Sequence, residues 1–354
     1  MAWDRPSYPQ LLLYALAVVL GVTIMVSAGT STAAFGAYNP AWDGTSEVRK
    51  TATTLGADPV VVQNTTRYQE VPPESSVAVV FSPTESYTDR EAARLREFVR
   101  AGGTLLIADD FREHSNPLLA EIGANARIDP VPLRDERRAG PSPAFPRATA
   151  VANHTYTQNA SAIMLNHGGT VRPSGATVLF ASSEFSYRDL NRDETLNSDE
   201  QLSRHPVVTV ESVGDGDVIV ASDASLFLNA MVERADNGAF LRSVVAPHDA
   251  VLVDVSHTVG VPPLVAFQLL LQRSGWIAFL VGTASVIGVV GLPYVPLLVR
   301  RLRTRREAEM SDVPRTADEI AAGIRERHPE WDADRIERVT DSLMRRRQQP
   351  DTDD

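Results

Sequence analysis

The sequence contains no cysteine, and Lys50 is its only lysine. Without cysteine the chain has no disulfide, no thiolate zinc site and no thiol nucleophile, so cysteine-dependent catalysis is excluded. The basic residues are almost all arginine, and acidic residues outnumber them to give a formal net charge of −11. An acidic surface keeps a protein hydrated, and it disfavours nucleic acid as a partner of the main domain.

Several motifs of catalysis and cofactor binding are also absent. The chain has no glycine-rich phosphate loop of the Walker or dinucleotide type and no G-x-S-x-G nucleophile elbow. The histidines between residues 38 and 273 are not spaced as metal ligands. These absences predict a protein that has no enzymatic activity. They assign it no definite cofactor.

Two long stretches carry no charge, and they fall near the two ends of the chain. Residues 10–30 and 274–299 are each about as long as the roughly 20 apolar residues that cross a bilayer, and RRLRTRR follows the second at Arg300. They predict two transmembrane helices, with the termini 1–9 and 300–354 in the cytoplasm and the main domain outside the cell membrane. A cleavable signal peptide is the alternative for the first stretch.

Residues 38–250 alternate short apolar runs with amphipathic stretches, which predicts an α/β domain; residues 251–273 are expected to connect it to the second span. Thr88 and Glu91 form a capping-box pattern, and Gly102 and Gly103 end that helix before an apolar strand, as in a βαβ unit with parallel strands. Strands are expected over 59–63, 76–82, 104–108, 177–182, 207–213 and 217–222, and helices over 88–100, 226–234 and 239–245. A hairpin turn is expected at Gly214–Gly216, and an irregular excursion over 128–160.

Three segments resemble the domain-of-unknown-function family 4350, which is common in halophilic archaea: AGGTLLIADDF from Ala101, GDGDVIVASDASLFLNAM from Gly214 and ADNGAFL from Ala235. The resemblance implies a flavodoxin-like or glutamine amidotransferase-like three-layer sandwich with a mainly parallel sheet. Relatives resemble the outer part of auxiliary subunits of gliding-motility ABC transporters. The family has no established activity, and the cysteine that an amidotransferase needs is missing here.

Polar residues follow two of the expected strands directly. Asp109 and Asp110 come after 104–108, and Asp223 comes after 217–222 with Asn229 further on. Because ligands of open parallel sheets gather beyond the carboxyl ends of the strands, these residues are candidate ligand-binding groups. Capping of turns and helices is the alternative role, since aspartate does this well at such junctions.

The segment DLNRDETLNSDE, residues 189–200, has oxygen-bearing residues at the spacing of a calcium loop. The candidate ligands at positions 1, 3, 5, 7, 9 and 12 are Asp189, Asn191, Asp193, Thr195, Asn197 and Glu200. Glu194 stands at position 6, where the sharp turn of such a loop favours glycine. A solvated acidic loop without a metal is the alternative interpretation.

The tail predicts two short helices over 316–327 and 332–347, whose apolar side chains are too few for an independent core. Taken together, the sequence favours a membrane-anchored binding or assembly protein, an auxiliary subunit of a membrane complex or ABC transporter. The expected partners are the lipid bilayer and other membrane or cytoplasmic subunits, with no nucleic acid. The alternatives are a hydrolase-like enzyme that uses the strand-end carboxylates and a calcium-responsive sensor.

Overall fold

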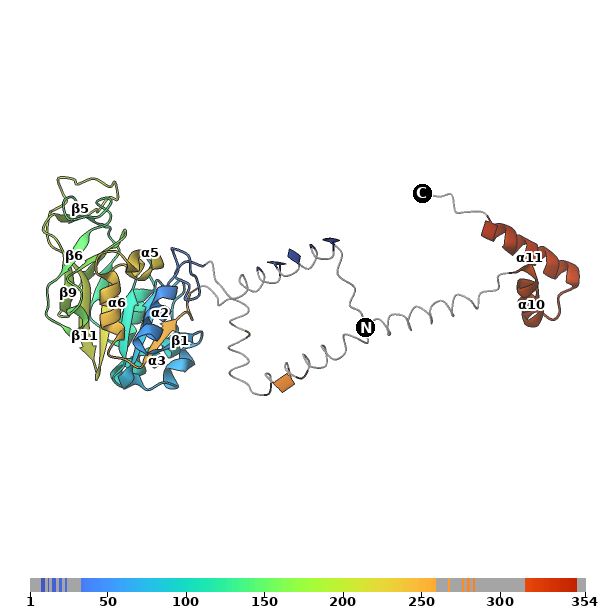
Figure 1. Ribbon diagram of the computed structural model, residues 1–354, viewed down its shortest axis with the longest axis horizontal. Helices are drawn as coiled ribbons and strands as arrows, with labels where there is room; N and C mark the ends of the chain where they lie inside the picture. Colours follow the sequence, from blue (N-terminus) through green and yellow to red (C-terminus); the bar gives the residue numbers. More distant parts are fainter. Residues whose placement is uncertain are drawn as a thin grey trace. The chain divides into compact units, whose positions relative to one another are not determined.

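The computed structural model describes residues 33–258 and 316–348, together with isolated residues within 8–23 and 267–283 (Figure 1). The chain divides into two compact units, one up to Leu269 and one from Leu270 onward. Residues 33–258 form an α/β domain. Residues 316–348 form a pair of helices.

A nine-stranded mixed sheet runs through the α/β domain in the order β1-β13-β2-β3-β12-β11-β9-β6-β7. Neighbours among the first five strands pair in parallel, and these strands are almost wholly apolar. Their bounds are β1 Asp58–Val62, β13 Ala250–Asp254, β2 Ser76–Phe81, β3 Thr104–Ala108 and β12 Gly216–Ala221. The expected strand–helix–strand unit over 76–108 is confirmed, because β2 and β3 pair in parallel around helix α3. β13 crosses the expected domain boundary at 250.

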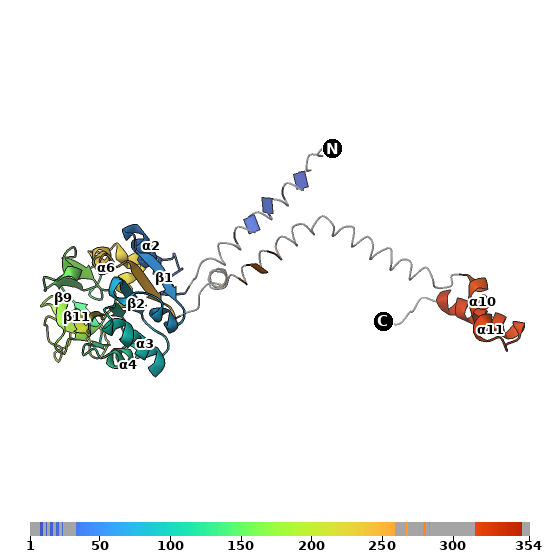
Figure 2. The ribbon, with the colours of Figure 1, turned by 90° about the horizontal axis from the view of Figure 1, so that it is seen from below.

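Helices cover both faces of the parallel strands, which are therefore buried on both sides. α2 (Ser46–Leu55) and α6 (Asn237–Val245) pack with alternate strand residues such as Val79 and Val253 in one core. α3 (Asp89–Arg100) and α4 (Ser115–Ile122) pack with the intervening residues in a second core, and Figure 2 shows the two pairs on opposite sides of the sheet. The capping box of α3 is confirmed: the Glu91 carboxylate accepts hydrogen bonds from the Thr88 amide and hydroxyl.

The other four strands run antiparallel to their neighbours, so the expectation of a mainly parallel sheet in a flavodoxin-like sandwich is wrong. The strands are β11 Pro206–Val213, β9 Thr177–Ser182, β6 Arg147–Ala150 and β7 Ala162–Met164. The reversal arises at the hairpin between β11 and β12, whose turn Gly214 and Asp215 was expected from the sequence. A two-residue turn joins antiparallel strands only, since a parallel crossover needs a much longer connection.

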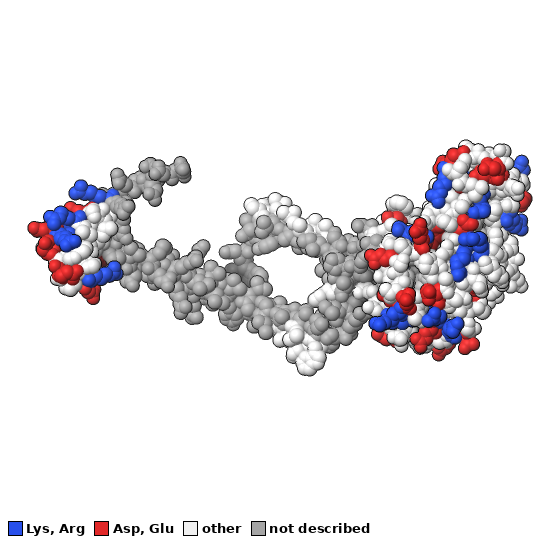
Figure 3. Space-filling view, turned by 180° about the vertical axis from the view of Figure 1, so that it is seen from behind, with Lys and Arg blue, Asp and Glu red and all other residues white. Residues whose placement is uncertain are grey.

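The segments between β3 and β11 also form two small antiparallel sheets outside the main one. β4 (Arg127–Asp129) pairs with β8 (Thr170–Arg172), and β5 (Leu133–Asp135) pairs with β10 (Ser186–Arg188). The rest of the domain consists of α5 (Asn229–Val232) and the 3-10 helices η1 Thr65–Gln69, η2 Pro73–Ser75, η3 Thr155–Thr157 and η4 Ala224–Phe227. Acidic and basic side chains are interspersed over the face of the domain in Figure 3.

The expectation of two transmembrane helices, and with it a two-pass location in the cell membrane, is contradicted. Within the described residues no helix is both long and apolar enough to cross a bilayer. The longest of these helices, α11, has 16 residues and carries charges along its length, whereas a crossing needs roughly 20 apolar residues. Apart from isolated positions such as Leu16 and Trp276, the spans 10–30 and 274–299 lie outside the described residues.

The second unit contains α10 (Ala317–Arg327) and α11 (Ala333–Gln348), close to the helices expected in the tail. Thr316 caps α10 by accepting a hydrogen bond from the Glu319 amide. Between the helices, the His328 and Trp331 rings stack at 4.2 Å, and the Arg335 guanidinium lies over Trp331. Ile336 is buried in this small helical pair.

Candidate functional site

Asp109, at the carboxyl end of β3, is sealed inside the domain. One carboxylate oxygen accepts hydrogen bonds from the Asp110 amide at 2.9 Å and the Ser82 hydroxyl at 3.2 Å, and the other accepts from Ser115 at 2.6 Å. Ser115 is the first residue of α4, so Asp109 fastens that helix to the sheet. Burial raises the pKa of Asp109 to about 6, although these hydrogen bonds favour the ionised form.

Asp223, at the carboxyl end of β12, is equally enclosed. Its two oxygens accept hydrogen bonds from the backbone amides of Asn166 at 2.6 Å and Ser225 at 2.7 Å. Burial raises the pKa of Asp223 to about 7, and the nearby charge of Asp110 adds to the effect. The Asp110 charge also adds to the effect of burial in raising the pKa of Asp109. The sheet therefore does bring the three predicted aspartates together.

The geometry of these aspartates fits the capping interpretation better than an open binding cleft. Asp109 and Asp223 have no solvent-accessible surface, and the carboxylate oxygens of each accept hydrogen bonds from donors within the domain. Only Asp110 reaches the surface, and its carboxylate accepts from the Phe111 amide next to it. A ligand would have to displace these internal donors to reach either buried carboxylate.

A third buried carboxylate, Asp254, ends β13 at the same edge of the sheet. It accepts hydrogen bonds from the Tyr68 hydroxyl at 2.8 Å and from the Ser256 amide and hydroxyl. Burial raises its pKa, as it does for Tyr68. Asp254 follows an apolar run in the way that Asp109 and Asp223 do, so the same sequence signal was available to find it.

Asn229, the fourth predicted ligand residue, is a structural clamp. Its side-chain nitrogen donates to the carbonyls of Asn39 and Ala41, at 3.0 and 2.6 Å, and its side-chain oxygen accepts from the Glu47 amide. Two backbone hydrogen bonds strengthen this contact. The Asn229 amide donates to the Gly44 carbonyl, and the Ala230 amide donates to the Trp42 carbonyl. Asn229 thereby fixes the turn 39–45 against α5.

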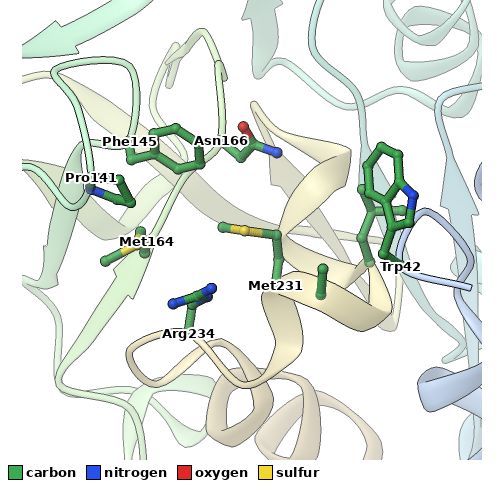
Figure 4. Close-up of a pocket in the computed structure, with 9 residues that line it drawn as sticks. Trp42, Pro141, Phe145, Met164, Asn166, Met231 and Arg234 are labelled. Atoms are coloured by element: carbon green, nitrogen blue, oxygen red, sulfur yellow. The ribbon is translucent and has the colours of Figure 1, made fainter.

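The turn that Asn229 fixes presents Trp42 to solvent, with 70% of its surface exposed. Gly44 is essential to this tight turn, because a Cβ there would lie 1.9 Å from the Asn39 carbonyl oxygen. Trp42 forms one wall of a pocket of 230 Å³, and Met231 lies between Trp42 and Met164 (Figure 4). The remaining lining residues are Pro141, Phe145, Asn166, Leu228, Ala230 and Arg234.

The pocket is apolar with one cation at its margin. Arg234 is exposed, and no ion pair involves it within the described part of the chain. Asn166, which gives its backbone amide to Asp223, supplies the polar side chain of the lining. The pocket therefore borders the strand-end cluster without opening into it, and it can accept one apolar group that carries a negative charge nearby.

The structure brings the six candidate calcium ligands into one loop that is already hydrogen-bonded. Asp189 is buried and accepts from Arg134 Nε at 2.7 Å and from the amides of Asp193 and Glu194 at 3.1 Å. The Arg134 guanidinium also pairs with Glu194 at 3.0 Å. Glu194 has a φ of +69°, so the sharp turn at position 6 forms without glycine.

The other members of the loop bind one another. Asp193 accepts from Asn197, Thr195 and Asn191, and the first of these bonds contributes most to lowering its pKa to about 2. Glu200 accepts from the amides of Leu190 and Asn197. No group of three or more His, Cys, Asp or Glu residues in the described part of the chain is placed to hold a metal ion. The calcium site stays a prediction.

Residues 37–245 match the family model described as "Domain of unknown function (DUF4350)". The chain belongs to the DUF4350 family. No curated protein matches this DUF4350 chain. The matched range begins before the Trp42 turn and ends with α6, so it contains both the pocket and two of the three strand-end carboxylates.

Solved structures give weak likenesses to this DUF4350 domain. The N-terminal domain of mmIFT52 is 15% identical, with a TM-score of 0.40 over 51% of this chain and 78% of that one. Cytoplasmic Protein STM1381 from Salmonella typhimurium LT2 is 13% identical, with a TM-score of 0.32 over 55% and 78%. Exo-beta-1,4-mannosidase Op5Man5 from Opitutaceae bacterium strain TAV5 is 18% identical, with a TM-score of 0.27 over 49% and 25%. At these scores none of the likenesses bears on function.

Reasoning from the sequence missed the pocket around Trp42. Its walls come from the turn 39–45, the hairpin at 139–146, the end of β7 and helix α5, which are far apart in the chain. No spacing along the chain marks such a set. The one local signal was a tryptophan between Asn39 and Gly44, a composition typical of an exposed turn.

Proposed function

We propose that the α/β domain is a non-enzymatic binding module that docks a partner protein through the Trp42 pocket. The observation that supports this is an exposed tryptophan beside an apolar hollow with one unpaired arginine at its margin. Tryptophan and arginine dominate binding energy in protein interfaces because they combine apolar area with a polar or charged group. A hollow of 230 Å³ suits a single apolar side chain rather than a large cofactor.

The occupant that fits is an apolar side chain flanked by a carboxylate, such as a carboxyl-terminal aromatic or leucine residue of a partner chain. Its apolar part would lie between Trp42 and the two methionines, and its carboxylate would meet Arg234. The resemblance to auxiliary subunits of gliding-motility ABC transporters agrees with a role in a multi-protein assembly. We also propose a haloarchaeal origin for the chain, because its acidic, lysine-poor composition is typical of halophilic archaea.

The test uses N-acetyl-phenylalanine as the smallest mimic of such an occupant. The purified full-length protein, labelled with ¹³C at its methionine methyl groups, is titrated with this probe while the methyl resonances are followed. We expect the resonances of Met164 and Met231 to shift with a Kd on the order of 1 mM, while that of Met344 in the second unit stays in place. The amide of the probe, which lacks the carboxylate, should bind more weakly.

Two variants make the result specific. Trp42→Ala should abolish the shifts, and Arg234→Gln should remove the preference for the acid over its amide while leaving weak binding. Arg100→Gln, an exposed arginine on α3 that lines no part of the pocket, is the control. Unshifted methionine resonances in the wild-type protein at 10 mM probe, or binding that survives Trp42→Ala, would refute the proposed function.

A hydrolase that uses the strand-end carboxylates is the second candidate function. The observation in its favour is that Asp109 and Asp223 have pKa values of about 6 and 7, near the range that a general acid or base needs. Their complete burial favours the binding function instead. Hydrolysis of simple p-nitrophenyl esters by the wild-type protein, lost in Asp110→Asn, would support the enzyme over the binding module.

A calcium-responsive sensor is supported only by the oxygen ligands of residues 189–200. The buried guanidinium of Arg134 already neutralises part of that loop. Calorimetric titration with calcium chloride tests this alternative, and a saturable heat that disappears in Asp193→Asn would support it.

A further inference from the structure

A second hollow borders the same hairpin, 139–146, that contributes to the Trp42 pocket. Its volume is 620 Å³, which falls in the range of small-molecule sites. It is lined by Arg137, Arg138, Ala139, Arg147, Thr149, Ala162, Ser183, Glu184 and Arg204. Four of these side chains are arginines and one is acidic, in a chain whose formal net charge is −11.

Asp135 positions the first two arginines from beneath the surface. This buried carboxylate accepts hydrogen bonds from the amides of Arg137 and Arg138, at 2.9 and 2.6 Å, through the same oxygen. Its other oxygen accepts from Ser183, which also lines the hollow, at 2.5 Å. One internal carboxylate therefore sets the turn that displays both arginines and ties it to a second lining segment.

The remaining arginines come from two further segments. The Arg147 amide donates to the Arg138 carbonyl at 2.8 Å, which places the two residues side by side at the start of β6. Arg204 also lines the hollow, and one of its guanidinium nitrogens lies 3.6 Å from a Glu184 carboxylate oxygen in a pair that is more than half exposed. Such a surface pair contributes little, so Arg204 remains available to a stronger partner.

The arginines have few partners of their own. Arg137 lies over the Phe185 ring at 4.6 Å, which holds its guanidinium in place without neutralising it. Within the described part of the chain, no ion pair involves Arg137, Arg138 or Arg147. Arg147 does act on Asp236 from a distance, because its charge adds to the Ser161 hydrogen bond in lowering the pKa of that carboxyl. Several guanidinium groups around one hollow repel each other, and an anion between them would relieve that repulsion.

We propose that this hollow, the arginine cavity, binds a small polyanion that carries two or more phosphate or carboxylate groups. Guanidinium is the side-chain group best matched to both, because its planar fork donates two parallel hydrogen bonds to their paired oxygens. Residues from three segments converge on the hollow, so a ligand with several anionic groups can contact more than one wall. Thr149 supplies a neutral hydroxyl among the charges.

This site is independent of the proposed partner-docking function. No residue lines both hollows, and the arginine cavity is polar where the Trp42 pocket is apolar. A failure of either proposal therefore leaves the other standing. Trp42→Ala serves as the variant that should leave polyanion binding unchanged.

The test is calorimetric titration of the full-length protein with two probes at 50 mM potassium chloride. Sodium tripolyphosphate represents phosphates, and citrate represents carboxylates. We expect saturable binding of at least one probe near one equivalent, with the stronger probe identifying the natural chemistry. The Arg138→Gln/Arg147→Gln double variant should bind at least tenfold more weakly. Affinity should also fall as salt is raised to 300 mM, because the contacts are charge pairs.

Arg100→Gln is the matched control, since Arg100 is an exposed arginine on α3 outside the cavity. It should bind as the wild-type protein does. All four lining arginines are exposed, so their substitution leaves the fold intact, and far-UV circular dichroism checks this. The absence of saturable heat with both probes overturns the proposal, as does an equal loss of affinity in Arg100→Gln.

Discussion

Aspartates with almost no solvent contact fasten the loops of the α/β domain. Asp109 ties α4 to β3, Asp135 sets the arginine turn, Asp189 holds the acidic loop, Asp223 holds η4, and Asp254 binds Tyr68. Each accepts two or more hydrogen bonds, which offsets the cost of removing a carboxylate from water. Where an aspartate ends or follows an apolar strand, as Asp109, Asp223 and Asp254 do, it is an interior anchor.

The raised pKa of Asp223 makes the stability of the domain depend on pH. In the folded state its pKa is about 7, above the roughly 3.9 of an unfolded chain. The folded state therefore holds this proton more tightly, so the contribution is fully present below pH 4 and is lost as pH rises through 7.

Substitution Asp223→Asn removes this titration. The difference in free energy of unfolding between Asp223→Asn and the wild-type protein should shift in favour of the variant, by on the order of 4 kcal/mol between pH 4 and pH 8. Urea denaturation at several pH values measures the difference. Asp215→Asn, in the exposed hairpin turn, should show a constant difference. A constant difference for Asp223→Asn as well would mean that Asp223 does not titrate in this range.

The buried ion pair between Arg134 and Asp189 predicts a large effect at a second position. Asp189→Asn should lower the free energy of unfolding by about 3–5 kcal/mol, because it leaves the Arg134 guanidinium without its main partner. Asp199→Asn changes an exposed carboxylate in the same loop and should stay within about 0.5 kcal/mol. Thermal unfolding of both variants makes the comparison. Equal effects would show that the buried pair contributes no more than the loop's surface charge.

At the scale of elements, the sequence predicted the parts that follow local rules. The capping box at Thr88, the βαβ unit around α3 and the two-residue turn at Gly214 depend on neighbours in the chain, and all three are confirmed. Strands β6 and β7 of the antiparallel half were missed because they are only four and three residues long, too short for a period of two to be visible.

The candidate site was predictable only in part, because only features that depend on neighbours in the chain can be seen in the sequence. Asp109 and Asp223 were found because an apolar strand precedes each of them directly. Trp42 and Arg234 were not found because they meet only after the turn 39–45 is pinned to α5 by Asn229. A convergence that depends on long-range packing leaves no pattern in a single sequence.

Gly216, at the start of β12, gives a prediction at this scale. A Cβ at this position would lie 2.2 Å from the carbonyl oxygens of Gly103 and Val99, where the hairpin meets the end of α3. Gly216→Ala should therefore lower the free energy of unfolding by about 1–3 kcal/mol, since both clashing atoms belong to the backbone and cannot rotate away. Chemical denaturation measures the loss, and Asp215→Ala in the adjacent exposed position should change it little. A Gly216→Ala variant as stable as the wild-type protein would show that α3 and the hairpin can separate freely.

At the scale of the whole molecule, the α/β domain and the helical pair are separate compact units. The domain has two cores of its own, one on each face of the sheet. A fragment of residues 33–258 should therefore fold alone and unfold at the same temperature as the domain in the full-length protein. Scanning calorimetry of both tests this, with tripolyphosphate and N-acetyl-phenylalanine binding as functional checks. A fragment that melts well below the intact protein would show that residues outside 33–258 stabilise the domain.

The change from parallel to antiparallel pairing at β11 separates the helix-covered strands from the proposed binding sites. The parallel strands lie under helices on both faces, and a substitution there disturbs a packed core. The arginine cavity and one wall of the Trp42 pocket are built instead by hairpins on the antiparallel side. Those hairpins can lengthen, shorten or exchange side chains while the parallel half still folds. The ligand preferences proposed for these sites can therefore diverge between relatives that keep the same scaffold, as they do among antibodies that differ only in their loops.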